Sequence, residues 1–219
     1  MTKTPIDATD LPGSVRDPTV TGLPNGFCYG VTRYADVILQ QAFPQHLGDL
    51  VGALAELVII RAQVEAGGGS KTPIATAFDQ SLKDRGWKKR TIEIGKTIDG
   101  ELIAKVRGHE IDMFKPSNDQ DSYPGVAVEM EWNNKDPFFD RDLLNYLALN
   151  REGGLAVGVI VTRGPALQAW LRANVSTGNQ KYGASTTHWD KLVPRVNLGG
   201  GGECPLRLIG IEPPRIVDP

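Results

Sequence analysis

The sequence predicts an α/β fold in which a central mixed β-sheet is flanked by helices. Two observations favour this class. Strand-like segments with alternating apolar residues are separated by segments in which apolar residues recur every three or four positions, as in helices. Residues 155–163, LAVGVIVTR, are apolar almost throughout, which is typical of a strand covered on both faces. A chain of 219 residues is long enough for one substantial core, so a single domain over 1–219 is expected.

The first third of the chain is expected to hold an irregular arm followed by helices. Residues 1–26 contain four prolines and almost no apolar periodicity, which indicates an N-terminal arm without regular structure. The spacing of apolar residues then predicts three helices, over 33–43, 46–65 and 72–86. Thr72 is a suitable N-cap for the third helix, and Pro73 is well placed in its first turn.

The remaining two thirds are expected to alternate between strands and helices. Asp99-Gly100 predicts a tight hairpin turn between two strands. Gly108 is expected to interrupt the returning strand, and Pro194 to interrupt the helix that contains it. The strands are expected over 91–98, 102–106, 109–115, 125–132, 155–163 and 204–212. The helices are expected over 140–151, 165–174 and 186–196.

The composition is that of an ordinary globular protein, with 40% hydrophobic and 23% charged residues. A charged n-region leading into an apolar stretch is absent from the sequence, and so is an apolar segment long enough to cross a membrane. We therefore expect a cytoplasmic protein without a membrane partner. Two cysteines are too few for a disulfide framework. The formal net charge of −2 does not favour a polyanionic partner, because most DNA-binding modules are more basic.

Three acidic residues lie in two of the predicted strands. Glu129 and Glu131 are two positions apart, so their side chains point to the same face of the strand. A short connection can lay Asp112 beside them on the neighbouring strand. Clustered carboxylates repel one another unless a cation lies among them, and a set of oxygen ligands favours Mg²⁺. The pattern therefore predicts metal-assisted phosphoryl chemistry, with nucleic acid as the substrate.

A simpler interpretation places these carboxylates in solvent. In an amphipathic antiparallel strand, Ala127, Glu129 and Glu131 would form the exposed face, and the residues between them would form the buried face. The helix and the apolar strand that follow indicate instead that 125–132 is a central strand, where an exposed carboxylate needs a reason. The sequence leaves both interpretations open.

The acidic residues also carry a resemblance to a known family. Asp112, a gap of 16 residues, and then Glu129-Met130-Glu131 resemble the D…ExE variant of the PD-(D/E)xK nuclease motif. The spacing resembles that of type II restriction endonucleases of the BamHI type. The helix that ends at Gly86-Trp87, followed by a β-meander and an acidic strand, is similar to the BglII and BstYI group, although that group has a shorter gap. Two positions depart from the pattern. Ile111 stands where the motif usually has proline, and Glu131 stands where the BglII-like group has glutamine.

The resemblance implies a fold, a chemistry and a role for each acidic residue. The fold would be a restriction-endonuclease-like core. Asp112 and Glu129 would bind Mg²⁺, with the main-chain carbonyl of Met130 as a further ligand. Glu131 would orient or deprotonate the attacking water, or help to hold a second metal ion.

The resemblance further implies double-stranded DNA as the partner, cut at a short palindromic site by a two-fold homodimer. The candidate DNA contacts are polar or basic residues near the ends of the two central strands, namely Asn133, Asn134, Lys135 and Arg163. Each of these also has a simpler interpretation, because asparagines form turns and basic side chains are usually solvated.

Other functions remain open from the sequence. A PD-(D/E)xK nuclease of repair or structure-specific type would carry the same motif. A carbohydrate- or protein-binding module with an acidic face that binds Ca²⁺ or faces solvent would not be an enzyme at all. An acidic residue upstream of the motif often joins such nuclease sites, and the candidates here are Glu56, Asp79 and Glu93.

Overall fold

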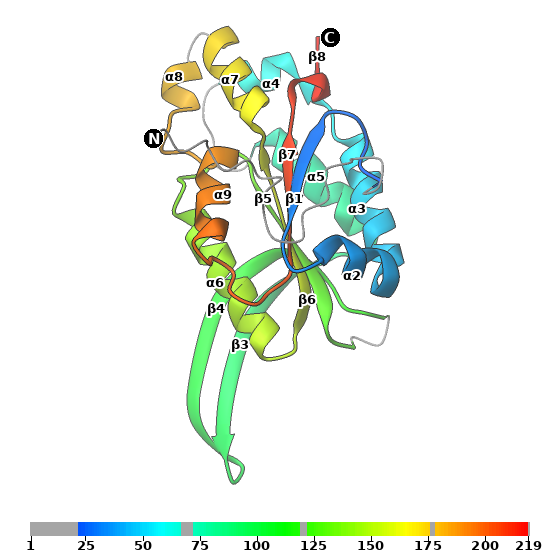
Figure 1. Ribbon diagram of the computed structural model, residues 1–219, viewed down its shortest axis with the longest axis vertical. Helices are drawn as coiled ribbons and strands as arrows, with labels where there is room; N and C mark the ends of the chain where they lie inside the picture. Colours follow the sequence, from blue (N-terminus) through cyan, green and yellow to red (C-terminus); the bar gives the residue numbers. More distant parts are fainter. Residues whose placement is uncertain (1–21, 67–71, 119–121, 176–177, 219) are drawn as a thin grey trace, which may run out of the picture.

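The computed structural model describes residues 22–66, 72–118, 122–175 and 178–218. Within these residues, six strands form one mixed sheet in the order β1-β7-β6-β5-β4-β3 (Figure 1). The strands are β1 (Phe27–Val31), β3 (Lys88–Ile98), β4 (Glu101–Lys115), β5 (Gly125–Glu131), β6 (Leu155–Arg163) and β7 (Leu206–Ile211). Strands β5, β6 and β7 run parallel, and the outer pairs are antiparallel. The predicted class, an α/β fold with a mixed sheet between helices, is confirmed.

Helices cover both faces of this sheet (Figure 1). They are α2 (Ala35–Ala42), α3 (Pro44–Glu56), α4 (Arg61–Glu65), α5 (Pro73–Asp84), α6 (Phe138–Arg151), α7 (Pro165–Asn174), α8 (Gly178–Lys181) and α9 (Trp189–Asn197). One hydrophobic core joins α2, α3, α5 and α7 to the sheet, and a second core joins α6 and α9 to the opposite face. The two central strands are therefore buried from both sides.

Strands β5 and β6 are the centre of the fold, as the apolar run over 155–163 predicts. Every residue of β5 is buried, and β6 is buried apart from the half-buried Ala156. The interpretation in which Ala127, Glu129 and Glu131 face solvent is therefore wrong. Helix α6 packs on the face of the sheet that an amphipathic strand would leave open to solvent.

The predicted helix over 46–65 is wrong, because the chain leaves the helical path after Glu56. It forms the short strand β2 (Ile59–Ile60), which pairs in parallel with β8 (Ile216–Val217), and then α4. The guanidinium of Arg215 donates hydrogen bonds to the carbonyl oxygens of Leu57 (2.8 Å) and Ala55 (2.8 Å) at the end of α3. A residue about 160 positions downstream thus satisfies carbonyl groups that a longer helix would have paired internally.

Strand β4 continues through Gly108, so the strand does not end there as predicted, although its register with β3 shifts at this point, between Thr91 and Glu93. A Cβ atom on Gly108 would lie 3.1 Å from Cβ of Ile92 and 3.4 Å from Oδ1 of Asn145 on α6. The glycine therefore allows β3, β4 and α6 to approach closely rather than ending the strand. The predicted Asp99-Gly100 turn is confirmed, with φ values of 50° and 86° that suit a two-residue hairpin.

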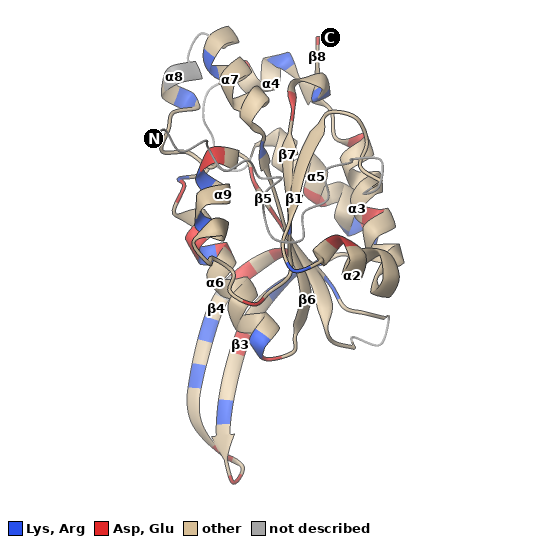
Figure 2. Cartoon of the chain, viewed as in Figure 1, with Lys and Arg blue, Asp and Glu red and all other residues tan. Residues whose placement is uncertain are grey.

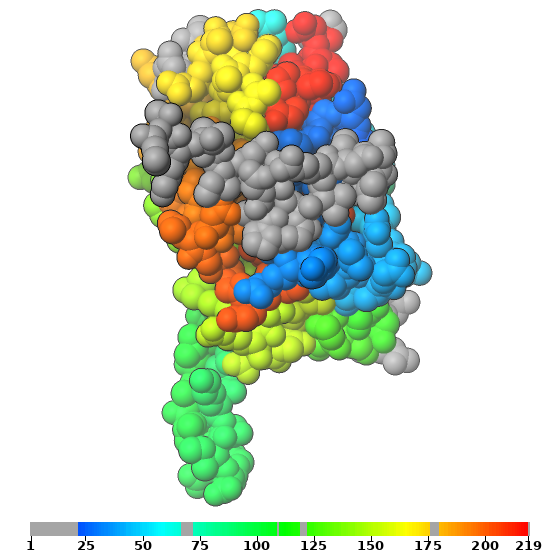
Figure 3. Space-filling model, viewed as in Figure 1, coloured from blue at the N-terminus to red at the C-terminus, as the bar shows by residue number. Residues whose placement is uncertain are grey.

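The β3–β4 hairpin projects from the body as a two-stranded ribbon (Figures 1 and 3). All residues from 95 to 107 are exposed. The strands closer to the body, from Lys88 to Ile92 and from Glu110 to Lys115, contain the residues of the hairpin that contribute to the cores.

Two smaller differences from the expected elements concern the ends of the chain. Strand β1, which pairs with β7, was not predicted. Helix α9 runs through Pro194 to Asn197 without interruption. The predicted arm over 1–26 lies mostly outside the described residues, of which 22–26 lack regular structure. Among the described residues, none of the helices is long and apolar enough to cross a membrane.

Candidate active site

The second core of the protein contains two carboxylates from β5. Glu129 and Glu131 lie on the face of β5 that packs against α6, and they are 1% and 2% exposed. The alternate residues, Val128 and Met130, point into the core on the other face of the sheet. This arrangement follows from the two-residue period of a strand, as predicted. Burial of two charged groups is costly unless they are paired or protonated, so their surroundings decide what they can do.

Helix α6 brings a third buried carboxylate to the same place. Asp142 lies on the buried face of α6 with Phe139 and Tyr146, at positions that are three and four residues apart. The hydroxyl of the fully buried Tyr146 donates a 2.8 Å hydrogen bond to the carbonyl oxygen of Val159 on β6. Gly158 makes room for this ring, because a Cβ there would lie 2.3 Å from its Cδ2. The contact of Tyr146 with β6 thus holds Asp142 over β5.

Asp142 was not predicted as a site residue, although the sequence contains a signal for it. In an amphipathic helix, a residue three or four positions from a core residue lies on the same buried face and is normally apolar. Asp142 occupies one of these positions in FFDRDLLNYLALNR, three residues after Phe139 and four before Tyr146. An acidic residue inside an apolar stripe indicates either a buried ion pair or a functional site.

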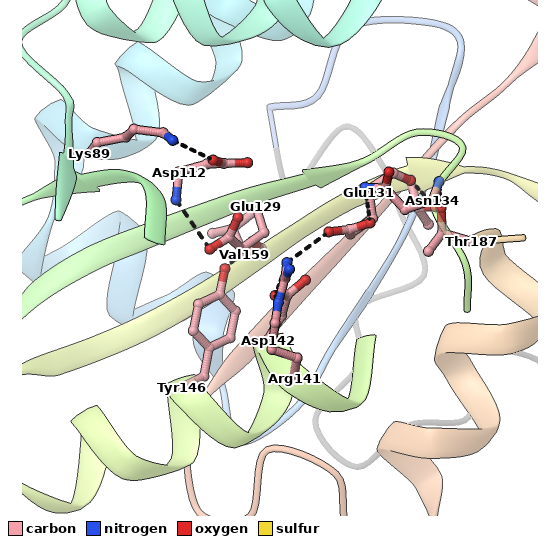
Figure 4. A network of polar contacts seen from close by, with 11 residues as sticks. Lys89, Asp112, Glu129, Glu131, Asn134, Arg141, Asp142, Tyr146, Val159 and Thr187 are labelled. Carbon is pink, nitrogen blue, oxygen red and sulfur yellow. Dashed lines mark hydrogen bonds and ion pairs between the residues drawn. The ribbon is translucent and has the colours of Figure 1, made fainter. Parts of the chain in front are cut away.

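Arg141 and Asn134 contact this carboxylate cluster (Figure 4). The guanidinium of Arg141 lies 2.7 Å from Oδ1 of Asp142 and 3.3 Å from Oε1 of Glu131, so it bridges the two acids. The side-chain amide of Asn134 donates a 2.7 Å hydrogen bond to Oε2 of Glu131. The Glu131 carboxylate therefore has a partner on each oxygen, which orients it.

The buried carboxyl groups hold their protons more strongly than ordinary ones. Burial raises the pKa of Glu129 well above its usual value, and the nearby Asp142 and Asp112 carboxylates raise it further. Burial, followed by repulsion from Asp142, raises the pKa of Glu131 to about 8. Burial also raises the pKa of Asp142, although Arg141 opposes this change. At neutral pH the group is short of positive charge, and a further cation would favour its ionised form.

Asp112 lies on the neighbouring strand β4, as predicted, but its carboxylate points away from the other two acids (Figure 4). The main-chain amide of Asp112 donates a 3.2 Å hydrogen bond to Oε1 of Glu129. Its carboxylate instead lies 3.7 Å from Nζ of Lys89 on β3. Among the residues that the structure describes, no group of three or more His, Cys, Asp or Glu side chains is already arranged to hold a metal ion. The predicted ligands are adjacent along the sheet without converging on one point.

The three upstream acidic residues differ in their distance from this site. A hydrogen bond to Glu110 is the main cause of the raised pKa of Lys89, and the charges of Asp112 and of Asp79, which is buried on α5, raise it further. Glu56 forms an exposed ion pair with Arg85, 2.5 Å between Oε1 and Nη2. Glu93 is paired with another residue of the projecting hairpin. Asp79 is therefore the one of the three candidates whose charge acts on Lys89, the residue that contacts Asp112.

The predicted DNA contacts fall into two groups. Asn133, Asn134 and Lys135 begin one residue after the end of β5, and the last two are exposed. The loop is held by Thr187, whose hydroxyl accepts a 3.1 Å hydrogen bond from the amide of Asn134. Asn134 and Lys135 are thus at the surface next to the carboxylates, where a contact with a large ligand is sterically open, whereas the Oδ1 atom of Asn133 is buried.

Arg163 belongs to the second group, because it has no access to the surface. The side chain is fully buried at the end of β6, and burial lowers its pKa to about 9. Its guanidinium donates hydrogen bonds to Oε1 of Gln168 (2.6 Å) and to the carbonyl oxygen of Thr187 (2.6 Å). The prediction of a direct DNA contact is wrong for this residue. Arg163 instead holds the segment that contains Thr187, which in turn holds Asn134.

Comparison with known protein families shows to which family the chain belongs. The family model described as restriction endonuclease BglII/BglIII matches residues 27–211, which run from the first residue of β1 to the last residue of β7. The chain belongs to this family. It is therefore a type II restriction endonuclease, as the D…ExE resemblance implies, and hence a DNA-binding hydrolase of the endodeoxyribonuclease class that cleaves DNA in a sequence-specific way.

Membership also bears on the chemistry of the carboxylates. Restriction endonucleases of this family generally use a divalent metal ion. The donor set at the end of β5 fits such an ion, because it consists of oxygen ligands whose burial leaves them in need of positive charge. A search of the curated proteins found no match to the chain.

Proposed function

We propose that the chain makes Mg²⁺-dependent double-strand breaks in DNA at a short palindromic site, acting as a homodimer with the D…ExE form of the PD-(D/E)xK motif. The observation that carries this proposal is the burial of Glu129 and Glu131, side by side, in a member of a restriction endonuclease family. A pair of buried carboxylates without a cation weakens a fold. A nuclease gains from it, because the pair attracts the metal ion that the reaction uses.

Asp112 and Glu129 would hold the Mg²⁺ ion, with the main-chain carbonyl of Met130 as a further ligand. When bound, the ion stabilises negative charge on the scissile phosphate and lowers the pKa of a water molecule. Lys89 holds the Asp112 carboxylate on the opposite side from Glu129, so Asp112 has to turn from Lys89 to act as a ligand. The side chain of Met130 is buried on the other face, which leaves its main chain as the part that could take part.

Glu131 is suited to handle the proton of the attacking water. Its pKa of about 8 leaves it largely protonated at neutral pH, and a cation beside it would favour the ionised form that can accept a proton. Arg141 and Asn134 orient its two oxygens, as described above. Asn133, Asn134 and Lys135 would contact the DNA beside the site, because they lie on the surface loop that continues β5.

A palindromic target and a homodimer are proposed together. The chain carries one cluster of this kind among its described residues, and a duplex has two strands to cut. Two copies related by a two-fold axis would place one site on each strand of a palindrome.

The test is to compare cleavage by the wild-type protein with cleavage by the variants Asp112→Asn and Glu129→Gln. Purified protein is incubated with unmethylated plasmid or phage DNA and Mg²⁺, and the fragment ends are sequenced. Discrete fragments with uniform ends are expected for the wild type. Each variant should cut at least about 10³-fold more slowly, because each loses a charge that acts on the transition state.

Glu93→Gln is the matched control for Glu129→Gln. It makes the same chemical change at an exposed glutamate of the hairpin, so cleavage should stay within about twofold of the wild type. Full activity in Asp112→Asn or Glu129→Gln would remove that residue from the site. Smeared products without uniform ends would instead indicate a structure-specific or repair nuclease.

A further inference from the structure

The projecting hairpin carries an apolar stripe along one of its faces. Cross-strand partners in an antiparallel pair point to the same side. The register places Ile94 opposite Val106 and Lys96 opposite Ala104, and, after a shift between Lys96 and Thr97, Ile98 opposite Glu101. We call these positions the hairpin stripe, which consists of Ile94, Lys96, Ile98, Glu101, Ala104 and Val106.

The hairpin stripe continues the second hydrophobic core into solvent. Ile92 and Ile111, nearer the body, are buried in that core, and Ile94 packs against its edge. Farther out, Ile98 and Val106 are 59% and 63% exposed. Ribbons of two strands are at best marginally stable in water, and contiguous exposed apolar surface on a soluble protein commonly marks an interaction site. The outer part of the hairpin therefore lacks the cover that the same face has nearer the body.

The charges of the stripe favour a protein partner over the phosphates of DNA. The stripe has one cation, Lys96, and one anion, Glu101, so its charge is zero. A surface that binds the DNA backbone instead requires an excess of positive charge. Residues of both signs occur along the ribbon (Figure 2). Lys105 and Arg107 lie on the opposite face with Glu93, and Lys105 pairs with Glu93 at 2.9 Å.

We propose that the hairpin stripe packs against the same stripe of a second copy of this chain, with the two ribbons antiparallel. This inference rests on the homodimer of the proposed function and assigns it a contact surface. A two-fold interface requires a surface that is complementary to itself. The rows of Lys96 and Glu101 lie two residues apart along the ribbon. A two-fold axis between these rows lays the Lys96 row of each copy over the Glu101 row of the other, so that Lys96 can reach Glu101 of the second copy beside the packed Ile98 and Ala104.

The size of the surface indicates a weak dimer. A face two strands wide and a few residue rows long buries on the order of several hundred Å² per copy, at the lower end of specific interfaces. Dimer formation through the two hairpins should therefore depend strongly on protein concentration.

The experiment uses charge reversal at the two positions. Sedimentation velocity, without DNA, is measured over about a hundredfold range of concentration for the wild type, Lys96→Glu and Glu101→Lys. In each single variant, positions 96 and 101 carry like charges in both symmetric contacts between the two copies, so the dimer should weaken by about tenfold or more. An equimolar mixture of the two variants pairs opposite charges again and should restore the dimer. A structural defect in either variant would not be repaired by mixing.

Lys105→Glu is the matched control, because it reverses an exposed charge on the opposite face and should leave association unchanged. A wild-type dimer that neither stripe variant weakens would overturn the inference while leaving the homodimer intact. That result would direct attention to another exposed apolar region, formed by Leu144 and Leu198 on α6 and after α9. A wild type that stays monomeric would overturn the homodimer as well, whereas cleavage by the variants at Asp112 and Glu129 judges the nuclease separately. Loss of DNA binding in Lys96→Glu without a change in association would assign the stripe to DNA and also overturn the inference.

Discussion

The end of β5 and the outer β3–β4 hairpin depart from the usual distribution of side chains in opposite directions. At the end of β5, carboxylates from Glu129, Glu131 and Asp142 are enclosed by the core under α6. Along the hairpin, Ile98, Leu102, Ile103 and Val106 are each more than half exposed. The same sheet thus buries charge at one place and exposes apolar surface at another, and β4 connects the two.

This comparison shows where the chain depends on something outside itself. Buried carboxylates that repel one another and exposed apolar surface each cost free energy in the isolated protein. A cation at the first place and a second protein surface at the second place would remove each cost. The predictions below test whether the two regions respond in opposite ways to the same kind of change.

The largest effect is expected for the pH dependence of stability at the carboxylate cluster. The folded-state pKa of Glu131 is about 8, above its value in the unfolded chain, so the folded protein binds more protons between about pH 4.5 and 8. Stability from this group is fully present below about pH 4.5 and is lost as pH rises toward 8, by on the order of 1 kcal/mol per pH unit. Glu129 and Asp142 act in the same direction, because burial raises the pKa of each.

Urea unfolding at a series of pH values measures this effect, with Glu131→Gln as the comparison. The difference between wild type and variant cancels the contribution of His46 and His188, whose pKa values burial lowers. The variant should gain stability relative to the wild type as pH rises. A difference that does not change with pH would contradict the raised pKa. Addition of Mg²⁺ should reduce the pH dependence of the wild type.

A smaller effect is expected when the same substitution is made in a buried strand and in the hairpin. Val159→Ala opens space in a fully buried position of β6 and should lower the free energy of unfolding by about 2 kcal/mol. Val106→Ala, at an exposed position, should lower it by less than about 0.5 kcal/mol. Denaturant unfolding at low protein concentration measures both. Equal costs would show that the hairpin is packed against the body in solution.

The smallest effect is expected for two ion pairs of different exposure. Lys115→Ala removes a half-buried contact with Asp49, 2.6 Å between Nζ and Oδ2, and should cost about 1 kcal/mol. Lys105→Ala removes the exposed pair with Glu93 and should cost less than about 0.5 kcal/mol. Thermal unfolding at low and high salt compares them, and salt should reduce the small cost of the exposed pair. A larger cost for Lys105→Ala would mean that the hairpin is less solvated than its exposure indicates.

Local patterns were enough to predict the centre of the fold. The strands over 125–131 and 155–163, the helix over 165–174 and the Asp99-Gly100 turn all follow from periodicity or from turn chemistry. Contacts between distant parts of the chain explain the failures. The helix expected over 46–65 ends early because Arg215 binds its carbonyl groups. Strand β1 exists because β7 offers it an edge, and the residues FCYGV alone do not predict that pairing.

For the candidate site, too, local patterns predicted some features, whereas features that depend on distant residues were missed. The shared face of Glu129 and Glu131 follows from the period of a strand, and their burial follows from a central position in the sheet. The direction of the Asp112 carboxylate depends on Lys89, which spacing along the chain does not reveal. Arg163 is buried because Thr187 and Gln168 supply acceptors for it from later segments. The roles of the acidic residues in catalysis stay predictions until the variants are measured.

The position of β7 has a consequence for how the protein is made. This strand comes late in the chain, yet it lies between β1 and β6 in the sheet. Phe27 pairs with Ile211, so β1 leaves the ribosome early and waits for about 180 further residues before it finds its neighbour. A nascent chain that ends before residue 206 lacks β7, and without β7 strand β1 has no neighbour in the sheet. Assembly of the enzyme is thereby delayed until translation of this region is complete, and truncated products cannot acquire the whole scaffold that supports cleavage.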